Sequence, residues 1–180
     1  MTVEKTLLEG VYVINNFISE DERGLFVKIF NKKKFEELNI DFEIRESYFS
    51  ISKKNVIRGM HFQLPPNAHE KLVFVQKGAI IDVVVDLRKS SPTYKSYISV
   101  ELSEGNKKSI FIPKGLAHGF KSLDDNTITV YNAATEYNAT ADAGISYNSF
   151  GYDWKVENPI LSNRDARFIG LNNFSENNPF

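Results

Sequence analysis

The sequence predicts an all-β protein, an antiparallel sandwich or barrel with a few short peripheral helices. Roughly ten short apolar segments recur at intervals of about 8–12 residues, separated by turn residues, which is typical of that class. The segments are rich in β-branched residues and too short for helices. A chain of 180 residues suits a single domain, and a hydrophobic content of 42%, with 14 Phe, is ample for an aromatic core.

The first third of the chain predicts three strands and one helix. Asn31–Asn39 is the helix candidate, because Asn31 can cap it and Phe35 and Leu38 fall on one face. Ser19–Gly24 is a polar turn between the first two strands. The expected strands are Gly10–Ile14, Leu25–Phe30 and Phe42–Ser52. This arm, about residues 1–50, can pair with its own sheet or with that of a second subunit, and the sequence leaves both open.

The following hundred or so residues predict a succession of strands. Besides the segment around His61, they are expected at Leu72–Val75, Ala79–Val85, Tyr94–Leu102, Ser109–Ile112, Phe120–Leu123, Thr127–Tyr131 and Ile145–Tyr147. From Ser149 onward Gly, Asn and Pro interrupt the pattern, so we expect short turns and one brief helix after Ser162. The polar residues 170–180 are expected to be a loosely held tail.

Composition excludes several kinds of partner. The formal net charge is −1 and no basic cluster is interleaved with aromatic residues, so no nucleic-acid surface is expected. The absence of cysteine excludes disulfides, thiolate metal sites and cysteine nucleophiles. The N-terminus has no basic region followed by an apolar one, and no apolar run is long enough to span a membrane. We therefore expect a cytoplasmic protein without a membrane partner.

The stretch Val56–Arg88 is the one around which the chain is organised. His61 lies on one strand segment and Lys71 begins the next, so both side chains can point into the same concavity. A lysine that enters an apolar run is costly to bury unless it meets an anion there. The stretch therefore predicts a pocket in which chemistry takes place.

Each histidine and two of the tyrosines have a structural and a functional interpretation. His61 can be a satisfied core histidine or a proton carrier, and His118 can be a turn residue or a ligand contact. His69 is expected to be exposed in its loop. Tyr131 and Tyr137 can be sheet aromatics, or they can supply a phenolic acid and a stacking surface.

A metal centre is one possibility, because Pro113-x-Gly115-x-x-His118 matches the second motif of the cupin superfamily. The first motif of a metal-binding cupin would read His-x-His, since a first-row metal needs three or four ligands together. Here the segment reads His61-Phe62-Gln63, with a single imidazole. We therefore expect a cupin-like antiparallel jelly-roll barrel with no metal and no other cofactor.

Without a metal, negative charge in the pocket needs another source of stabilisation. Lys71 and Arg58 can provide it electrostatically, and His61 can move protons near neutral pH. A histidine base works best with a carboxylate that fixes its tautomer. The candidates for that carboxylate are Asp82, Asp86 and Asp165, and the spacing does not choose among them.

Six segments, in order, resemble one known family. They are Arg58–Gln63, Lys71–Val73, Asp82–Arg88 with Ser91–Tyr94, Ile112–Phe120, Gly144–Ile145 with Asp153–Trp154, and Leu161–Asp165. From Asp21–Phe26 to Asp165 the chain is similar to the dTDP-4-dehydrorhamnose 3,5-epimerases, metal-independent cupins that act on nucleotide-linked 4-keto-6-deoxy sugars. The resemblance implies an isomerase that inverts C3, C5 or both next to the C4 ketone, in deoxysugar synthesis of the rhamnose type for surface polysaccharides.

The resemblance also implies a role for each matched residue. His61 is the general base and Asp165 its partner, although Ser162-x-x-Asp165 also has the form of a capping box. Lys71 is the cation that stabilises the enolate, and Tyr131 is the acid that reprotonates the opposite face. The expected substrate contacts are Arg58, His118 and Arg164 near the phosphates, Tyr137 near the nucleotide, and Glu46, Gln63, Arg23 and Phe26. The last two match a segment that, in the family, reaches into the neighbouring subunit's site, which implies a homodimer.

Three positions depart from the family's pattern. Glu46 and Tyr48 stand where Gln and Asn are common, and Lys28 stands where Glu is common. These departures leave open whether the nucleotide is dTDP, CDP or GDP. They also leave open whether C3 alone or both carbons are inverted, and which sugar is the product.

Two other functions stay open beside the epimerase. A related cupin 3,4-ketoisomerase moves the carbonyl instead, and it would favour a second histidine where Phe62 stands. A non-catalytic, sugar-binding cupin would be expected to lack the catalytic positions. All four of them are present, namely His61, Lys71, Tyr131 and Asp165.

Overall fold

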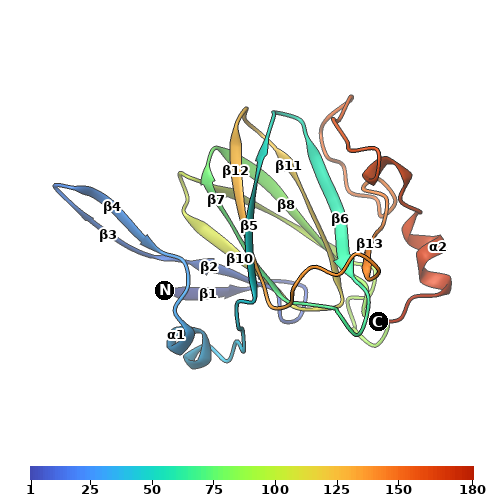
Figure 1. The fold of residues 1–180 in the computed structure, drawn as a ribbon, viewed down its shortest axis with the longest axis horizontal. Coiled ribbons are helices and arrows are strands. Elements are labelled where there is room, and N and C mark those ends of the chain that lie inside the picture. Colours follow the sequence, from blue (N-terminus) through green and yellow to red (C-terminus); the bar gives the residue numbers. More distant parts are fainter.

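Two antiparallel sheets form the body of the protein and face each other across the core (Figure 1). The computed structural model describes residues 1–180. In spatial order, the larger sheet contains β1 (Thr2–Lys5), β2 (Tyr12–Asn15), β10 (Lys108–Ile112), β7 (Lys71–Lys77), β12 (Thr127–Ala133) and β5 (Glu46–Ser52). The smaller sheet contains β13 (Asp142–Gly144), β6 (Ile57–Gln63), β11 (Leu116–Ser122), β8 (Ala79–Asp86) and β9 (Tyr97–Ser103). The predicted all-β class is confirmed.

The helical elements are short and peripheral. They are α1 (Lys32–Glu37), α2 (Leu171–Glu176) and a 3₁₀ turn at Asp165–Arg167. The first helix begins where the sequence predicts, because the Lys34 N–H donates to Asn31 Oδ1 at 3.0 Å, and Phe35 is fully buried. No helix combines the length and the apolar character that crossing a lipid bilayer would require.

Several strands differ from the sequence-based prediction, among them β11, which begins at Leu116 rather than Phe120. β1 is not predicted because its residues are mostly charged or exposed, and pairing with β2 supplies its order. β5 begins at Glu46 rather than Phe42, because Phe42 packs beneath α1 against Phe35. β13 ends just before the predicted Ile145–Tyr147, although Ile145 still exchanges two backbone hydrogen bonds with Met60, of 3.0 and 3.2 Å.

The C-terminal segment packs against the smaller sheet, which differs from the expected loosely held tail. Leu171 of α2 is buried, and Asn178, 3% exposed, donates its side-chain N–H to the carbonyl of Leu87 at 2.6 Å. The Phe180 ring packs edge-on against Phe62, with centroids 5.7 Å apart. The polar composition misleads here because one Asn satisfies a buried carbonyl while the last Phe supplies an apolar anchor.

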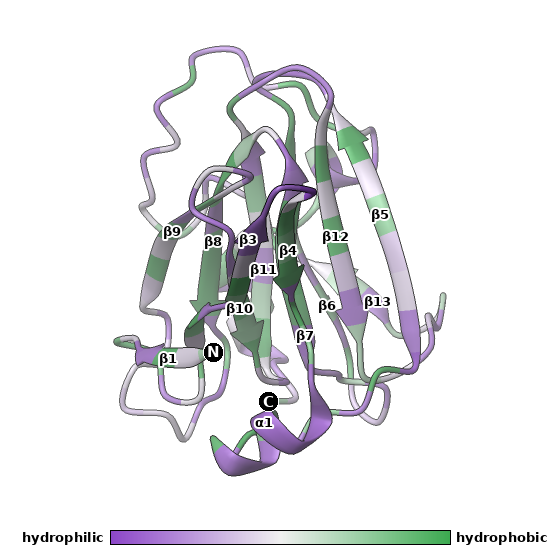
Figure 2. Ribbon diagram, turned by 90° about the vertical axis from the view of Figure 1, so that its left-hand side faces the viewer, coloured by the Kyte–Doolittle hydropathy of each residue, from purple (hydrophilic) through white to green (hydrophobic).

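A two-stranded hairpin projects away from the body of the protein (Figure 1). It consists of β3 (Phe17–Asp21) and β4 (Gly24–Lys28), so the predicted polar turn is only its tip. Its apolar side chains are uncovered, with Phe17 and Phe26 46% and 56% exposed. Figure 2 shows hydrophobic stretches on β4 and, on the same side of the molecule, on β12 and β5. A single chain therefore leaves an apolar surface open to solvent.

A register shift in β6 directs two side chains into the space between the sheets. The ladder between β6 and β11 changes register between Arg58 and His61. Strict alternation would place these residues, three apart, on opposite faces of the sheet. Gly59 makes the close approach possible: its φ is 135°, and a Cβ there would lie 2.5 Å from the Cα of Gly119.

Candidate active site

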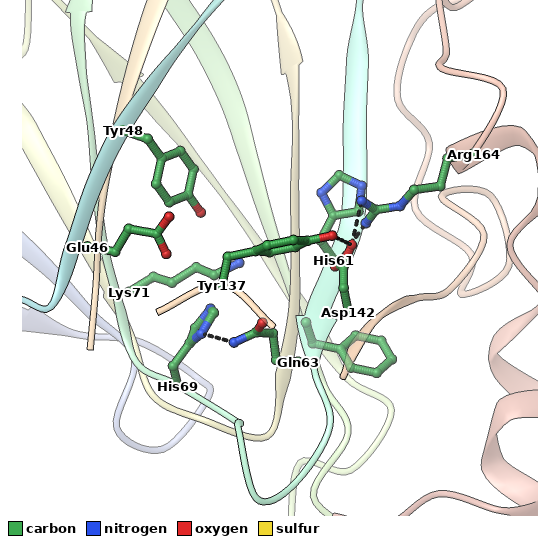
Figure 3. Close-up of a pocket in the computed structure, with 10 residues that line it drawn as sticks. Glu46, Tyr48, His61, Gln63, His69, Lys71, Tyr137, Asp142 and Arg164 are labelled. Carbon is green, nitrogen blue, oxygen red and sulfur yellow. Dashed lines mark hydrogen bonds and ion pairs between the residues drawn. The ribbon is translucent and has the colours of Figure 1, made fainter. Parts of the chain in front are cut away.

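The cavity between the sheets consists of two adjoining hollows. The first hollow, about 320 Å³, is lined by Glu46, Tyr48, His61, Phe62, Gln63, His69, Lys71, Tyr137, Asp142 and Arg164 (Figure 3). The second hollow, about 240 Å³, is lined by Tyr48, Ser50, Arg58, His61, Lys71, His118, Phe120 and Tyr131. Three residues line both hollows and therefore stand at their junction: Tyr48, His61 and Lys71.

One wall of the cavity is the inner face of β5. Alternation along this strand directs Glu46, Tyr48 and Ser50 toward the cavity. The residues between them, Phe49 among them, point outward, and Phe49 and Ile51 are 64% and 56% exposed. The polar face of this edge strand is thus the inner one, which is the reverse of the usual arrangement in a sandwich.

Tyr131 stands beside this wall on β12. It lies directly opposite Tyr48 in the ladder between β12 and β5, and the two rings stack with centroids 4.9 Å apart and planes 17° apart. The Tyr131 hydroxyl lies 3.2 Å from Ser50 Oγ. Burial raises the pKa of Tyr131 well above its usual range, so the phenol keeps its proton at neutral pH.

Lys71, at the start of β7, brings a cation into the cavity. Burial lowers the pKa of Lys71 to about 8, and the negative charges of Asp142 and Asp82 oppose that shift. The side-chain amine of Lys71 is therefore mostly protonated at pH 7. No carboxylate of the chain lies within ion-pair distance of Lys71, so the anion that the sequence leads us to expect is left to a ligand.

His61 faces this group from β6 and is paired with Asp165. His61 Nε2 lies 2.9 Å from Asp165 Oδ1, while Asp165 Oδ2 accepts the N–H of Gly59 at 3.1 Å. Burial lowers the pKa of His61, and the hydrogen bond that His61 donates to Asp165 only partly offsets it, so the imidazole is neutral at pH 7. The tautomer that donates Nε2–H to Asp165 leaves Nδ1 with a free lone pair.

Asp165 also begins the 3₁₀ turn, whose N-cap residue, Arg164, makes no side-chain cap hydrogen bond. The Asp165 N–H donates to Ser162 Oγ at 3.0 Å, at the start of the 3₁₀ turn. Burial acts to raise the pKa of Asp165, but the hydrogen bond and charge of His61 and the Gly59 N–H outweigh it, so that pKa lies below its usual range. Of the capping box that the sequence suggests, only the bond from the Asp165 N–H to Ser162 is present, and the Asp165 carboxylate pairs with His61 and Gly59 instead.

The other two candidate aspartates have different partners. Asp82, fully buried on β8, lies 2.7 Å from His118 Nε2, and its Oδ1 has no hydrogen-bond partner. Burial raises the pKa of Asp82, and His118 opposes the rise. Asp86 is paired with Arg88 at 2.8 Å and lies outside the cavity lining.

The residues expected near the phosphates are not gathered at one point. His118 is 4% exposed and lies in the second hollow beside Tyr131, with ring centroids 6.3 Å apart. Arg58 lines the same hollow and donates to Ser52 Oγ at 3.1 Å. Arg164 lines the first hollow instead.

The open end of the first hollow carries an ion pair and an exposed aromatic ring. Arg164 is held by Asp142, with a shortest N–O distance of 2.7 Å, and the Tyr137 hydroxyl donates to Asp142 at 3.3 Å. Tyr137 is 61% exposed and lies across the middle of the view in Figure 3, between the two walls. An exposed ring beside a guanidinium suits the recognition of a base and a phosphate.

Gln63 and His69 are built into the floor of the first hollow. The Gln63 amide donates to His69 Nδ1 at 2.9 Å, and its oxygen accepts the N–H of Asn138 at 2.6 Å. Gln63 thereby fixes the loop that carries Tyr137, and its polar atoms are largely used within the protein. The expectation that His69 is exposed is wrong: its Nε2 is buried without a partner, and burial lowers its pKa to about 3.

Arg23 and Phe26 lie outside the cavity of their own chain. Both belong to the projecting hairpin (Figure 1), and the Arg23 side chain is 87% exposed and pairs with Asp21 at 2.6 Å. No part of the hairpin lines either hollow.

Sequence reasoning misses some of the lining residues. Ser50 and Asp142 are not singled out, Tyr48 is noted only as a departure, and the pairing of Asp82 with His118 is not anticipated. Period-two alternation from Glu46 could have found the first wall residues, whereas the pairs come from distant segments. No group of three or more His, Asp or Glu side chains is placed so that it could hold a metal ion.

Comparison with known proteins places the chain in a family. A family model described as dTDP-4-dehydrorhamnose 3,5-epimerase matches residues 5–173. A dTDP-4-dehydrorhamnose 3,5-epimerase of Shigella flexneri is 41% identical over 168 residues, which are 92% of this chain and 93% of the relative. A crystal structure of the Bacillus anthracis dTDP-4-dehydrorhamnose 3,5-epimerase, with TDP and pyrophosphate bound, is 38% identical, with a TM-score of 0.92 over 94% of this chain and 99% of that one.

A 3'-monoepimerase of Streptomyces bikiniensis, crystallised with dTDP-quinovose, has the same fold. It is 26% identical, and the TM-score is 0.89 over 95% of this chain and 88% of that one. Together these similarities confirm the predicted cupin-like jelly roll and the predicted epimerase of nucleotide-linked 4-keto-6-deoxy sugars. The chain belongs to the dTDP-4-dehydrorhamnose 3,5-epimerase family of isomerases.

Proposed function

We propose that the protein inverts both C3 and C5 of a dTDP-linked 4-keto-6-deoxyhexose, with His61 as the base and Tyr131 as an acid. The observation that carries the proposal is that these two residues come from facing sheets and line one hollow together with Lys71. Inversion of a carbon requires that a proton leave from one face and another arrive on the opposite face. A sugar held between the two sheets presents its two faces to these two groups.

The ketone at C4 explains why one site can serve two carbons. Protons on C3 and C5 are both acidified by the neighbouring carbonyl, and removal of either gives an enolate whose charge lies on the C4 oxygen. His61 Nδ1 accepts the proton, and Asp165, 2.9 Å from the other ring nitrogen, stabilises the imidazolium that forms. General base help of this kind contributes about 10²–10⁴-fold.

Lys71 is the group that stabilises the enolate. Its ammonium has no anionic partner in the protein, and it stands at the junction of the hollows with His61. A preorganised cation at a developing oxyanion contributes about 10²–10³-fold. The neutral phenol of Tyr131, fixed by Ser50 and by its stack on Tyr48, then returns a proton to the carbon.

The nucleotide end of the site is the open end of the first hollow. We assign the base to Tyr137 and the diphosphate to Arg164 and Arg58, because a ring and two guanidinium groups are the chemistry that such a ligand needs. The choice of dTDP rests on the TDP bound in the Bacillus anthracis relative and on the names of the relatives. CDP- and GDP-linked sugars are the alternatives to be compared in the assay.

A homodimer is part of the proposal. The exposed hairpin carries Arg23 and Phe26 away from the chain's own cavity, and an apolar groove of about 540 Å³ runs between β4 and the outer face of the larger sheet. A second copy of the chain would cover this surface and bring the hairpin toward its neighbour's site. We also propose a cytoplasmic location, since a charged nucleotide sugar does not cross a membrane unaided.

The experiment is proton NMR of the purified enzyme in deuterated water with dTDP-, CDP- and GDP-linked 4-keto-6-deoxyglucose. Deuterium is expected at C3 and C5 of the dTDP sugar. His61→Ala is expected to stay folded and to lose exchange at both carbons. Exchange at the wild-type rate in that variant would show that the base is a different residue.

A further inference from the structure

Tyr48 is a second phenol on the wall of the cavity that carries Tyr131, and in the proposed reaction it only supports the Tyr131 ring. Among the residues that line the two hollows, it shares its position at their junction with His61 and Lys71 alone. Those two are the base and the cation of the proposed reaction. Tyr48 therefore adjoins the two groups that, in the proposed reaction, act on the carbons next to the ketone and on its oxygen.

Tyr48 is on the same side of the cavity as Tyr131 and opposite the base. It comes from β5, next to β12 in the larger sheet, whereas His61 comes from β6 of the smaller sheet. Figure 3 shows the Tyr48 hydroxyl directed into the first hollow, with His61 on the far side. A proton from Tyr48 would reach the sugar on the face that is turned away from the base.

The contacts of Tyr131 fix its side chain, so its hydroxyl can reach only part of the cavity. Its ring stacks on Tyr48 at 4.9 Å and packs against Phe120, with centroids 6.4 Å apart, and its hydroxyl is bound to Ser50. It lines the second hollow only, whereas Tyr48 lines both. The two phenols thus cover different parts of the cavity.

The reaction has two carbons to reprotonate. C3 and C5 are about 2.5 Å apart, the span of two carbon–carbon bonds that meet at the trigonal carbon C4. A single fixed donor is aligned with one of them at a time, because proton transfer needs the donor within about 3 Å and in line. With two neighbouring phenols on one face, each carbon has a donor of its own, and His61 is the only one of the three groups that must reach both carbons.

We propose that Tyr48 is a second proton donor of the site, so that Tyr48 and Tyr131 each reprotonate one of the two carbons that flank the ketone. This inference rests on the proposed function, the inversion of both C3 and C5. It adds a catalytic residue at a position that the family pattern fills with Asn.

The step balances in the same way for each phenol. His61 takes the proton from one carbon, and the electron pair of that C–H bond becomes the enolate charge on the C4 oxygen. The phenol O–H bond then breaks, its proton bonds to the carbon on the opposite face, and the ketone re-forms. The phenolate and the imidazolium that remain are reset by a net transfer of one proton from His61 to the phenolate through water.

The environment of Tyr48 suits a donor. Partial burial raises the pKa of Tyr48 to about 12, and the negative charge of Glu46 acts in the same direction, so the phenol carries its proton at neutral pH. The Tyr131 hydroxyl is bound to Ser50, whereas no hydrogen bond within the chain occupies that of Tyr48. Its proton is free to be directed at a ligand.

The test compares Tyr48→Phe with Tyr131→Phe and resolves the two carbons. Each purified variant is incubated with the dTDP-linked 4-keto-6-deoxyglucose in deuterated water, and NMR follows the rate of inversion at C3 and at C5 separately. We expect Tyr48→Phe to slow inversion at one carbon by about 10-fold or more and to leave the other within about twofold. Tyr131→Phe is expected to slow inversion at the other carbon.

Two further variants separate the hydroxyl from the ring. Tyr48→Leu removes the stack as well as the hydroxyl, so Tyr131 loses its support and inversion is expected to slow at both carbons. Tyr97→Phe, at the edge strand β9 outside both hollows, is the control and is expected to leave both rates unchanged. Thermal unfolding of each variant confirms that it is folded.

Several outcomes would overturn the inference. If Tyr48→Phe slows both carbons equally or neither, its hydroxyl is not a selective donor. If both Phe variants slow inversion at the same carbon, the assignment of one phenol to each carbon is wrong. A wild-type enzyme that inverts only one carbon needs no second donor, which would refute the role of Tyr48 and the inversion of both carbons, while leaving His61 as the base of an epimerase. No inversion at either carbon of any of the three sugars would instead refute the proposed function itself.

Discussion

His118 Nε2 and Asp82 Oδ2 lie 2.7 Å apart, and His118 stands directly opposite His61 in the ladder between β6 and β11. The cavity therefore contains two neighbouring histidine–carboxylate pairs. The pair with Asp165 faces the open hollows, and the pair with Asp82 is buried. The charge of Asp82 also acts on Lys71, whose pKa it helps to keep from falling further. Asp82 thus favours the protonated form of Lys71 without contacting it.

Asp82→Asn is expected to lower the pKa of Lys71 below its present value of about 8, because one of the charges that favour the ammonium is removed. The loss of activity on the alkaline side should then begin at lower pH, by roughly half a unit to one unit. The measurement is kcat/KM of wild type and variant between about pH 6 and 10. Asp153→Asn, at an exposed ion pair with Lys155, is the control. An unmoved alkaline limb would show that Lys71 is not the group that titrates.

Lys71→Met is expected to raise stability while removing activity. The pKa of Lys71 is lower in the folded than in the unfolded chain, so below about pH 8 folding must bury an ammonium, and this cost disappears as the pH rises from about 8 toward the ordinary value. The variant should be more stable at pH 7 by about 1–4 kcal/mol, or about 2–4 °C in Tm for each kcal/mol. Epimerisation should fall by about 10²-fold or more.

The matched control for this lysine is Lys77→Met, at the exposed far end of the same strand. It should change neither Tm nor rate appreciably. A lower Tm for Lys71→Met would mean that the ammonium is already compensated within the protein.

Asp165→Asn is expected to lower kcat by about 10²–10⁴-fold with little change in KM, because the imidazolium loses its partner and the ring its fixed tautomer. The carboxylate raises the pKa of His61 against the effect of burial. Its removal should therefore lower that pKa further and move the acidic limb of the pH–rate profile to lower pH. Ser162→Ala removes only the hydrogen bond that the Asp165 N–H donates to Ser162 and should cost about 0.5–1.5 kcal/mol of stability while leaving kcat intact. A KM effect alone would point to a binding role for Asp165.

Subunit mixing tests whether the hairpin serves a neighbouring site. Arg23→Ala and His61→Ala homodimers should both be nearly inactive under the proposed arrangement. A mixed dimer should regain activity, because the chain with an intact His61 receives the hairpin of the partner with an intact Arg23. Coexpression with two different tags isolates the mixed dimer, and its theoretical limit is one working site in two. If the hairpin served its own chain, neither site of the mixed dimer would be complete.

Gly59→Ala is expected to be strongly destabilising. The residue has a φ of 135°, and its new Cβ would meet the backbone of Gly119 at 2.5 Å, so both strain and a backbone clash oppose it. We expect a loss of about 2–4 kcal/mol, measured by urea unfolding. Gly24→Ala at the hairpin tip is the matched control: its φ is 111°, but no atom lies within 4 Å of the added Cβ. Equal losses would mean that the backbone angle alone decides.

Much of the fold is predictable because it is local. Short β-branched runs and turn residues give the strands and their approximate limits, and Asn31 marks the start of α1 correctly. The register shift between Arg58 and His61 is not predictable in the same way, since it depends on the approach of Gly119 from another strand. The tail is misjudged because its anchors, Asn178 and Phe180, act through residues about ninety positions or more away.

The residues of the site follow the same rule: those that stand out from their sequence neighbours are predictable, and those paired with distant residues are not. His61 and Lys71 stand out locally, as an imidazole and a cation in apolar strands. The choice among three aspartates does not, because Asp165 is 104 positions from His61 and Asp82 is 36 from His118. Tyr48 is missed for a different reason: on β5 the apolar residues face outward, so the usual rule that apolar residues mark the inner face points the wrong way.

His61, the proposed base, belongs to one sheet, and Lys71, Tyr48 and Tyr131 belong to the other. No ladder of backbone hydrogen bonds ties those two layers together at the cavity, so their separation is set by side-chain packing and by the hydrogen bonds that Arg58 of β6 donates to Ser52 and Ile51 of β5. Stereochemical inversion in this enzyme is consequently a property of the gap between layers. Mild denaturant or large-to-small substitutions in the core should weaken the packing between the sheets. Turnover is then expected to stop while the circular dichroism of the strands is still intact.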